Sequence, residues 1–224
     1  MLPFTTEEFF AVFARYNNAI WPAQIGAAAL GLAALILLFR SGPVANRVIS
    51  LILAAFWLFM GIGYHLLFFS RFNTLAYAFG LLFVAEAALL FVDGVLRPKI
   101  MFRAEPGWRA WLAWSLITYG LVIYPLIGLF GSHPYPMTPL FGVAPCPTTI
   151  FTLGLLVLSN ASWHLLVIPL VWSVIGGSAA MLLAVPQDYG LILAGAISAA
   201  LRLSQRLQPP IPSGQLFEVE PDHL

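Results

Sequence analysis

The chain contains one cysteine, which lies between two prolines in a stretch that carries several chemically useful side chains. Residues 131–154 read GSHPYPMTPLFGVAPCPTTIFTLG, so His133 and Met137 come shortly before Cys146. Imidazole, thioether and thiol are the donors that thiophilic ions such as Cu(I) prefer. One prediction is therefore a soft-metal site at this connector, with His65 from an earlier segment as a further ligand. The spacing of these residues matches no established metal motif.

The prolines around Cys146 predict where a helix begins. Proline is tolerated in a helix only in the first turn, so the stretch should be a stiff connector that ends at a helix start at or near Pro147. The helix dipole would then favour the thiolate form of Cys146 and make it reactive. The alternative role is structural, with Cys146 packed in the connector while Thr148 and Thr149 cap the helix start.

Two further ionisable residues lie inside apolar segments. Glu86 is near the middle of LLFVAEAALLFVDG, where an ionised carboxylate at the centre of a bilayer costs at least about 2.5 kcal/mol. It should face the bundle interior, either as a proton, ion or ligand site or as a structural hydrogen-bonding group. His65 follows Gly61 and Gly63, which allow helices to approach closely, and it could bind a metal, relay a proton or bond a carbonyl.

Other polar residues are expected to have structural contacts. Asp93 lies near the end of the same segment as Glu86, within reach of Arg97 or Lys99. His164 is expected to make a hydrogen bond at the membrane interface, far from His65 and His133. The small residues of IGGSAAMLLA, 175–184, predict a face for close helix packing.

Composition assigns the chain to the membrane class. Of its 224 residues 61% are hydrophobic and only 8% are charged, and the mean hydropathy is +0.91. Soluble domains carry about 25% charged residues, so this chain could not cover a water-facing surface. A net charge of +1 provides no basic stripe for nucleic acid. The lipid bilayer is the predicted partner.

The apolar segments predict an all-α bundle of about seven transmembrane helices. A membrane-spanning helix needs about 20 apolar residues. Six windows meet this need or nearly do, and a seventh is shorter: 20–39, 48–69, 75–96, 111–130, 163–184, 187–204 and the short 148–159. The polar SNAS at 159–162 separates the short window from the next. Six spans plus a re-entrant segment is the alternative.

Basic residues predict the orientation. Cytoplasmic loops of membrane proteins are enriched in lysine and arginine. With the N-terminus outside and the C-terminus inside, only Arg15 and Arg71 are external, whereas eight basic residues are cytoplasmic: Arg40, Arg47, Arg97, Lys99, Arg103, Arg109, Arg202 and Arg206. The connector that holds Cys146 is then on the external side.

Three regions follow along the chain. Residues 1–19 contain Thr5 and Glu8 in a capping-box pattern before an aromatic stretch, which predicts an amphipathic helix lying in the external interface. Residues 20–206 form the transmembrane helical domain. Residues 207–224 are proline-rich and acidic and are expected to be a disordered cytoplasmic tail.

Four segments carry a family resemblance: WLFMGIGYHLLFF, FNTLAYAFG, HPYPMTPLFGVAPCPTTIFT and IPLVWSVIGGSAA. They resemble those of a family of small bacterial multi-pass membrane proteins that is known as a domain of unknown function. The resemblance covers nearly the whole chain, and PCPTTIFT is its most specific part. It implies a bacterial inner-membrane protein and supports the number of spans, but it implies no activity.

Three functions are consistent with these residues. The first is binding or transfer of a small ligand or soft metal ion at an external site built from His65, His133 and Cys146, with Met137 and Glu86 as further members. The second is a non-catalytic accessory or assembly subunit of a membrane complex or homo-oligomer. The third is an intramembrane enzyme that uses Cys146 or a histidine-bound metal. The sequence has no Walker loop, GxSxG or HExxH motif, and it identifies no cofactor.

Overall fold

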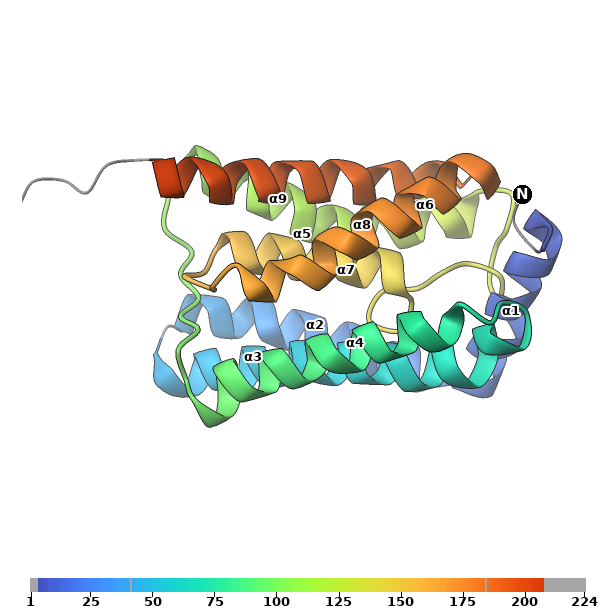
Figure 1. Ribbon diagram of the computed structural model, residues 1–224, viewed down its shortest axis with the longest axis horizontal. Coiled ribbons are helices and arrows are strands. Elements are labelled where there is room, and N and C mark those ends of the chain that lie inside the picture. Colours follow the sequence, from blue (N-terminus) through green and yellow to red (C-terminus); the bar gives the residue numbers. More distant parts are fainter. Residues whose placement is uncertain (1–3, 41, 184, 208–224) are drawn as a thin grey trace, which may run out of the picture.

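The computed structural model describes residues 4–40, 42–183 and 185–207, and this part of the chain is helical without a β-sheet (Figure 1). Of the expected disordered tail, 207–224, Leu207 is the last residue of a helix, and residues 208–224 lie outside the described residues. The α-helices are α1 Thr6–Ala19, α2 Ala23–Arg40, α3 Pro43–Phe59, α4 Ala76–Phe91, α5 Trp108–Thr118, α6 Tyr124–Phe130, α7 Pro145–Val157, α8 His164–Leu183 and α9 Tyr189–Leu207. Wider π-helical turns extend α3 over Met60–Phe68 and α4 over Val92–Leu96, and join α5 to α6 over Tyr119–Ile123.

The predicted helical membrane bundle is confirmed. Five of the described helical segments are long and apolar enough to cross a membrane: Ala23–Arg40, Pro43–Arg71, Ala76–Leu96, Trp108–Phe130 and His164–Leu183. Large apolar side chains such as those of Phe39, Val174 and Leu81 are well exposed on the outside of the bundle, as contact with lipid requires. Because α7 has only 13 residues and α9 is outside this group, the total of seven spans stays a prediction.

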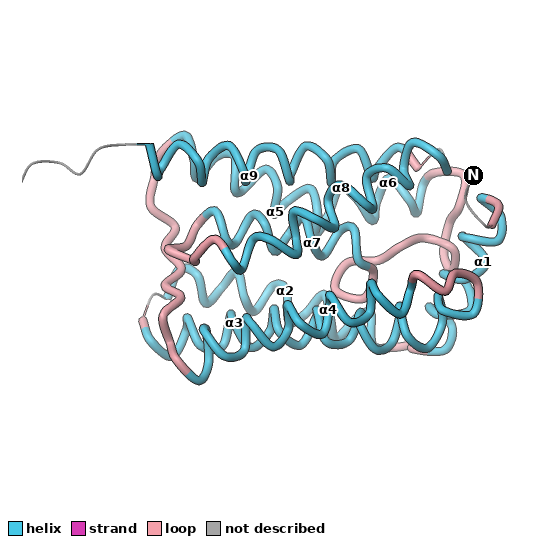
Figure 2. The backbone as a smooth tube through the Cα atoms, viewed as in Figure 1, coloured by secondary structure: helices cyan, strands magenta, loops and turns pink. Residues whose placement is uncertain are grey.

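The short helix α7 lies at the centre of the bundle. It packs against α5, α8, α9 and α3, and its side chains from Pro147 to Leu156 are all buried. The connector before it enters the bundle from the end where α1 lies, as Figure 2 shows. Phe141, Val143 and Ala144 of this connector are almost fully buried. Non-helical backbone at membrane depth is tolerated only where protein or a cavity surrounds it, and here the bundle surrounds it.

The predicted helix start at or near Pro147 is confirmed. Helix α7 begins two residues earlier, at Pro145, with Ala144 as its N-cap. The first amides of a helix have no partner within the helix, so a buried helix start must satisfy them. Proline has no N–H group, so Pro145 and Pro147 leave Cys146 with the only amide hydrogen in the first three positions. The proline pair therefore removes donors that the interior could not satisfy.

Thr148 closes the same turn. Its hydroxyl donates to the carbonyl of Ala144 at 2.8 Å and accepts from the amide of Gly142, also at 2.8 Å. Gly142 has a φ of 77°, which favours glycine, and an added Cβ there would lie 2.6 Å from Ala27 Cβ. The expected capping of the helix by Thr148 and Thr149 is not observed, because the start of α7 has no side-chain cap, and the Thr148 hydroxyl fixes the turn before the helix instead.

Helix α1 covers the end of the bundle and holds the connector in place (Figure 1). The predicted capping box is confirmed, because Thr5 and Glu8 each bond the backbone of the other. Asn17 donates its side-chain amide to the carbonyls of Pro136 and Thr138 at 2.7 and 2.8 Å. The aromatic side chains of α1 pack on the bundle, so the location of α1 in the membrane interface stays a prediction.

The opposite end of the bundle is closed by the connector between α4 and α5. Asn46 of α3 accepts the amide of Phe102 at 3.0 Å, and Asn160 accepts that of Met101 at 2.8 Å. The carboxylate of Asp93 makes two contacts at this end. Its oxygens lie 2.7 Å from His164 Nε2 and 3.6 Å from Lys99 Nζ. The predicted structural roles of Asp93 and His164 are confirmed, and Lys99 is the basic partner.

Small residues allow the predicted close helix contacts. A Cβ added to Gly61 would lie 3.1 Å from the carbonyl oxygen of Gly80, where α3 and α4 approach each other. A Cβ added to Gly177 would lie 2.2 Å from Ile192 Cγ1, where α8 meets α9. The glycine at the start of the 175–184 stretch therefore allows close helix packing, as predicted.

Candidate functional site

Cys146 lies beside a carboxylate that comes from a distant part of the chain. Asp188 belongs to the turn Pro186–Asp188 between α8 and α9, and it is only 4% exposed. Its carboxylate accepts hydrogen bonds from the hydroxyl of Tyr124 and from the thiol of Cys146. The indole of Trp172 lies against the same thiol. Three helices and one turn thus converge on this polar cluster, which consists of Tyr124, Cys146, Trp172 and Asp188.

The environment of Asp188 favours the neutral acid, yet leaves it ionised near neutral pH. Burial raises the pKa of Asp188 to about 6, while the hydrogen bonds from Tyr124 and Cys146 act to lower it. Among the described residues no lysine, arginine or histidine forms an ion pair with it. A buried carboxylate of this kind normally has a cationic partner, and the described residues supply none at this site.

The expected activation of the Cys146 thiol is wrong. The positive end of the α7 dipole does lie at the site. Burial raises the pKa of Cys146 well above its ordinary value, however, and the neighbouring Asp188 raises it further. The thiol therefore donates a hydrogen bond as a neutral group. A nucleophilic cysteine needs a base or a lowered pKa, and the environment of Cys146 raises the pKa instead.

A cavity of about 210 Å³ opens beside the polar cluster, and Cys146 and Asp188 form part of its wall. Helix α8, helix α1 and the segment from Tyr64 to Leu75 before α4 supply most of the rest. The wall is strongly aromatic, with Phe4, Phe9, Phe13, Tyr64, Phe69, Phe79 and Trp172. Asn73 and Ser178 are its other polar members. The site therefore combines an apolar, aromatic chamber with a single anionic group.

His65 lies behind the wall of this cavity. Its ring is fully buried among aromatic rings, with centroids 4.6 Å from Phe83 and 5.1 Å from Trp172. Neither ring nitrogen has a hydrogen-bond partner within the described part of the chain. Because Trp172 touches both His65 and the Cys146 thiol, it separates the imidazole from the thiol. His65 is thus near the site without lining it.

His133 and Met137 are not among the residues that line the cavity. The His133 ring stacks on Phe10 with centroids 3.6 Å apart, and its carbonyl accepts the hydroxyl of Thr138. Met137 is 39% exposed. Across residues 4–40, 42–183 and 185–207, no three histidine, cysteine, aspartate or glutamate side chains come together as metal ligands. The structure does not bring His65, His133 and Cys146 into one coordination sphere.

Glu86 is a separate buried group. It is fully buried in α4, on the same face as Phe83 and Leu90, and it does not line the cavity. Both of its carboxylate oxygens lack a hydrogen-bond partner within the described residues. A carboxyl group in this state is unusual in a membrane bundle, and both roles expected for Glu86, functional and structural, stay predictions.

The comparison with known proteins establishes the family. Residues 6–212 match the model of a family of unknown function, DUF6064. The chain belongs to this family. The match covers nearly all of the described bundle, including α1 and every residue of the cavity wall except Phe4. No curated protein and no solved structure matches the sequence.

In this DUF6064 member, the sequence prediction missed Asp188, Tyr124 and Trp172. Asp188 carried one local signal, because an aspartate directly before an apolar helix is a typical N-cap residue, but this pattern predicts a helix start and not a buried site. Tyr124 and Trp172 lie in apolar stretches that contain several aromatic residues, and nothing local distinguishes them. Only the fold of the DUF6064 chain brings them to Cys146.

Proposed function

We propose that this membrane protein binds a small organic cation with a mainly apolar body in the cavity beside Cys146 and Asp188. One observation carries the proposal: a buried carboxylate that has no ionic partner among the described residues forms part of the wall of an aromatic cavity. An ammonium group in the cavity would supply the missing positive charge. Its apolar body would occupy the aromatic chamber.

The chemistry of the cavity wall favours a cation over a neutral ligand. Aromatic faces carry negative potential, and cages of such faces bind quaternary ammonium groups in other proteins. Tyr64, Phe69 and Phe79 of the wall come from two neighbouring segments and could surround such a group. A volume of about 210 Å³ restricts the ligand to a compact molecule, smaller than a typical drug.

The polar cluster has a positioning role in this proposal. Tyr124 and Cys146 donate to the Asp188 carboxylate and hold it ionised and oriented, which leaves its remaining lone pairs for the ligand. His65 and Glu86 would lie deeper as proton-accepting groups if the ligand is moved rather than only held. His133 and Met137 lie near α1 and outside the cavity wall, so they would not contact the ligand directly.

The orientation and the membrane also belong to this proposal. The cavity lies at the end of the bundle that carries Arg15 and Arg71, whereas the other described basic residues gather at the opposite end. The positive-inside rule then supports an external cavity, an external N-terminus and a cytoplasmic C-terminus. The resemblance to bacterial proteins supports the inner membrane as the location.

The decisive experiment uses benzyltrimethylammonium as the probe and neopentylbenzene, its neutral isostere, as the control ligand. Binding to the full chain in detergent would be followed through tryptophan fluorescence and confirmed by calorimetry. We expect the cation to bind and the isostere to bind at least about tenfold more weakly, since a desolvated contact between a cation and aromatic faces alone contributes about 2 kcal/mol.

Two variants give the experiment its specificity. Asp188→Asn keeps the shape of the side chain and removes its charge, so it should reduce cation affinity at least about tenfold and leave the isostere unaffected. Glu7→Gln removes an exposed charge from the same end of the molecule, and it should change the affinity for neither the cation nor the isostere. Equal affinity for cation and isostere, or equal losses in the two variants, would contradict the proposal.

A further inference from the structure

The aromatic cavity contains two further polar side chains that the binding of a cation does not by itself require. Tyr64 and Asn73 form part of its wall, and both residues are more than nine-tenths buried. Tyr64 belongs to the π-helical extension of α3, and Asn73 to the segment before α4. Polar groups are few in a small-molecule site and decide its specificity, so their hydrogen bonds bear on the identity of the ligand.

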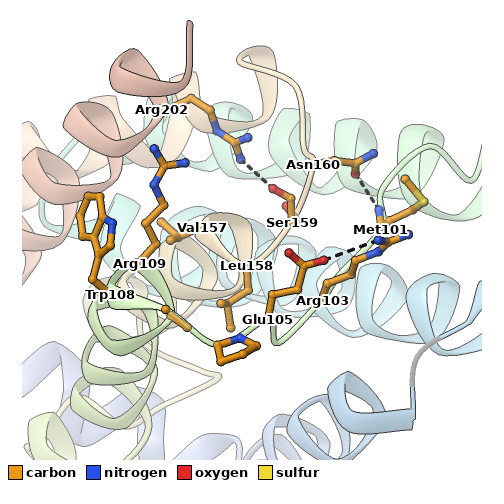
Figure 3. A pocket seen from close by; sticks show the side chains of 13 residues that line it. Met101, Arg103, Glu105, Trp108, Arg109, Val157, Leu158, Ser159, Asn160 and Arg202 are labelled. Carbon is orange, nitrogen blue, oxygen red and sulfur yellow. Dashed lines mark hydrogen bonds and ion pairs between the residues drawn. The ribbon is translucent and has the colours of Figure 1, made fainter. Parts of the chain in front are cut away.

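The larger hollow at the opposite end of the bundle, of about 760 Å³, is different (Figure 3). There Arg103 lies 3.5 Å from the carboxylate of Glu105, and Arg202 donates to the carbonyls of Leu156 and Ser159 at 2.9 and 3.3 Å. These arginines are bonded to the protein itself. The aromatic cavity is therefore the better candidate for a further ligand contact.

The hydroxyl of Tyr64 borders the cavity without a hydrogen-bond partner among the described residues. The partnerless polar atoms that are sealed inside this part of the chain do not include the Tyr64 oxygen, so the oxygen reaches open space, and the cavity is the space that Tyr64 lines. Phe13 and Phe69 stack nearly parallel to the ring, with centroids 4.8 and 5.5 Å away, and so fix its direction. Asp188 and Cys146 lie within electrostatic range of the hydroxyl.

The side-chain amide of Asn73 is oriented by the turn that contains it. Its Oδ1 accepts the backbone amide of Leu75 at 3.0 Å, so its NH₂ group is the end left for another partner. Within residues 4–40, 42–183 and 185–207, nothing accepts a hydrogen bond from this NH₂ group. Ser178, the remaining polar residue of the wall, already donates to the carbonyl of Ile175 at 2.7 Å. Outside the polar cluster, the wall thus offers one O–H and one N–H donor.

We propose that Tyr64 and Asn73 bind an oxygen atom of the ligand, which is then an organic cation with an ether, carbonyl or hydroxyl oxygen in its otherwise apolar body. This inference rests on the proposed function and specifies its ligand further. Neither an ammonium group nor an alkyl chain can accept a proton from a hydroxyl or an amide. A purely apolar body would displace water from both donors and leave them unpaired, and sites built in this way discriminate against ligands that lack the acceptor.

The two ends of the ligand then have separate partners. The Asp188 carboxylate binds the ammonium group, and the two donors bind the oxygen. Because the cavity holds only about 210 Å³, the oxygen must lie within a few bonds of the nitrogen. Contacts at two points also fix the direction in which the ligand lies, which a single carboxylate in an aromatic chamber would not do.

The test compares cations that differ in one atom. The compound (2-methoxyethyl)trimethylammonium has an ether oxygen where butyltrimethylammonium has a methylene group, and the 3-methoxypropyl and pentyl compounds form the same pair with one more carbon. Binding to the full chain in detergent is followed by tryptophan fluorescence and calorimetry. We expect at least one ether to bind about tenfold more tightly than its alkyl isostere. Equal or weaker binding of both ethers would overturn the inference.

Two variants assign the preference to the donors. Tyr64→Phe removes the hydroxyl and keeps the ring, so it should reduce the preference for the ether at least about threefold. Asn73→Asp keeps an oxygen for the Leu75 amide but replaces the donor with an acceptor, so it should also reduce the preference. Tyr77→Phe, at an exposed ring of α4 outside the cavity wall, should leave it unchanged. A preference that survives both Tyr64→Phe and Asn73→Asp would contradict the role of these donors.

Neutral isosteres separate this inference from the proposed cation site. In 1-methoxy-3,3-dimethylbutane a carbon replaces the ammonium nitrogen of the methoxyethyl compound, and 2,2-dimethylhexane is its alkyl counterpart. Preference for the ether in this neutral pair, lost in Tyr64→Phe, together with no preference for cations over neutral compounds would contradict only the cation site. Preference for cations without any preference for ethers would contradict only the oxygen contact.

Discussion

The hydroxyl of Tyr124 donates a hydrogen bond to the carboxylate of Asp188, and so joins the start of α6 to the turn before α9. The two residues are 64 positions apart, and both are buried. The contact holds Asp188 against Cys146 at the wall of the aromatic cavity. It also stabilises the ionised form of a carboxylate that burial would otherwise neutralise.

Replacing Tyr124 by phenylalanine should shift the titration of Asp188. The hydrogen bond from Tyr124 acts to lower the pKa of Asp188, so its loss should move that pKa upward from about 6. The measurement is the pH midpoint of benzyltrimethylammonium binding in Tyr124→Phe and in the parent chain. Tyr135→Phe, altered at an exposed ring, is the control. A midpoint that stays unchanged in Tyr124→Phe would show that the hydroxyl does not influence the carboxylate.

Cation binding should itself depend on pH. Asp188 attracts the cation only when ionised, so affinity should be full above pH 7 and fall as the pH drops through about 6. At pH 5 the loss should be about tenfold, since about one molecule in ten is then ionised. Titrations at pH 5, 6, 7 and 8 check this. The same series on Asp188→Asn should be flat, and a sloping series there would assign the dependence to another group.

Asp188 should reduce stability at neutral pH. Its pKa is raised above the unfolded value of 3.8, so the folded state binds the proton more tightly, and stability falls as the pH rises from about 4 to about 6 and stays low above it. The full effect is about 3 kcal/mol, of which about 1 kcal/mol falls between pH 5 and 8. Thermal unfolding in detergent measures it.

The variant Asp188→Asn isolates this contribution. It should lose the pH dependence of unfolding that belongs to Asp188, and at pH 8 it should be at least as stable as the parent chain. Greater stability together with lost cation binding would be the expected trade between stability and function. A clear loss of stability at pH 8 would indicate that the carboxylate serves the fold instead.

The Cys146 thiol should react slowly. Burial and the neighbouring carboxylate keep it protonated, so alkylation by iodoacetamide at pH 8 should be at least about tenfold slower than that of glutathione. The rate should rise to the free-thiol value after unfolding, and benzyltrimethylammonium should slow it further, because Cys146 lines the cavity. Mass spectrometry of the labelled chain follows both. Rapid labelling of the folded chain would restore the reactive-thiolate hypothesis.

The central position of α7 can be tested with two glycines. A Cβ at Gly120 would lie 2.5 Å from the carbonyl oxygen of Pro147 and 2.9 Å from the amide nitrogen of Phe151. Gly120→Ala must therefore separate two backbones and should cost about 1–3 kcal/mol of stability. At Gly26, inside α2, nothing lies within 4 Å, so Gly26→Ala should be neutral or stabilising by up to about 1 kcal/mol. Similar effects at both positions would argue against the close contact of α5–α6 with α7.

The amino-acid sequence alone determined the class and the positions of the helices. A chain with so few charged residues must lie in lipid, and the window predicted at 20–39 corresponds to α2 at Ala23–Arg40. The capping box at Thr5 and Glu8 and the glycine contacts of α3 with α4 also followed from local pattern. These features depend on residues that are near each other in the chain, where composition and spacing are sufficient.

Only the tertiary structure decided what surrounds Cys146. His133 was expected beside the thiol because it is near in sequence, but the connector turns inward after it and His133 stacks on Phe10 instead. Asp188 and Tyr124 reach the thiol from segments 42 and 22 residues away, through helix packing that no local spacing encodes. Tertiary structure also decided the charge state of the Cys146 thiol, because burial and the carboxylate of Asp188 outweigh the helix dipole there. A site made at the meeting of several helices is set by long-range packing, and the sequence around one residue carries no record of it.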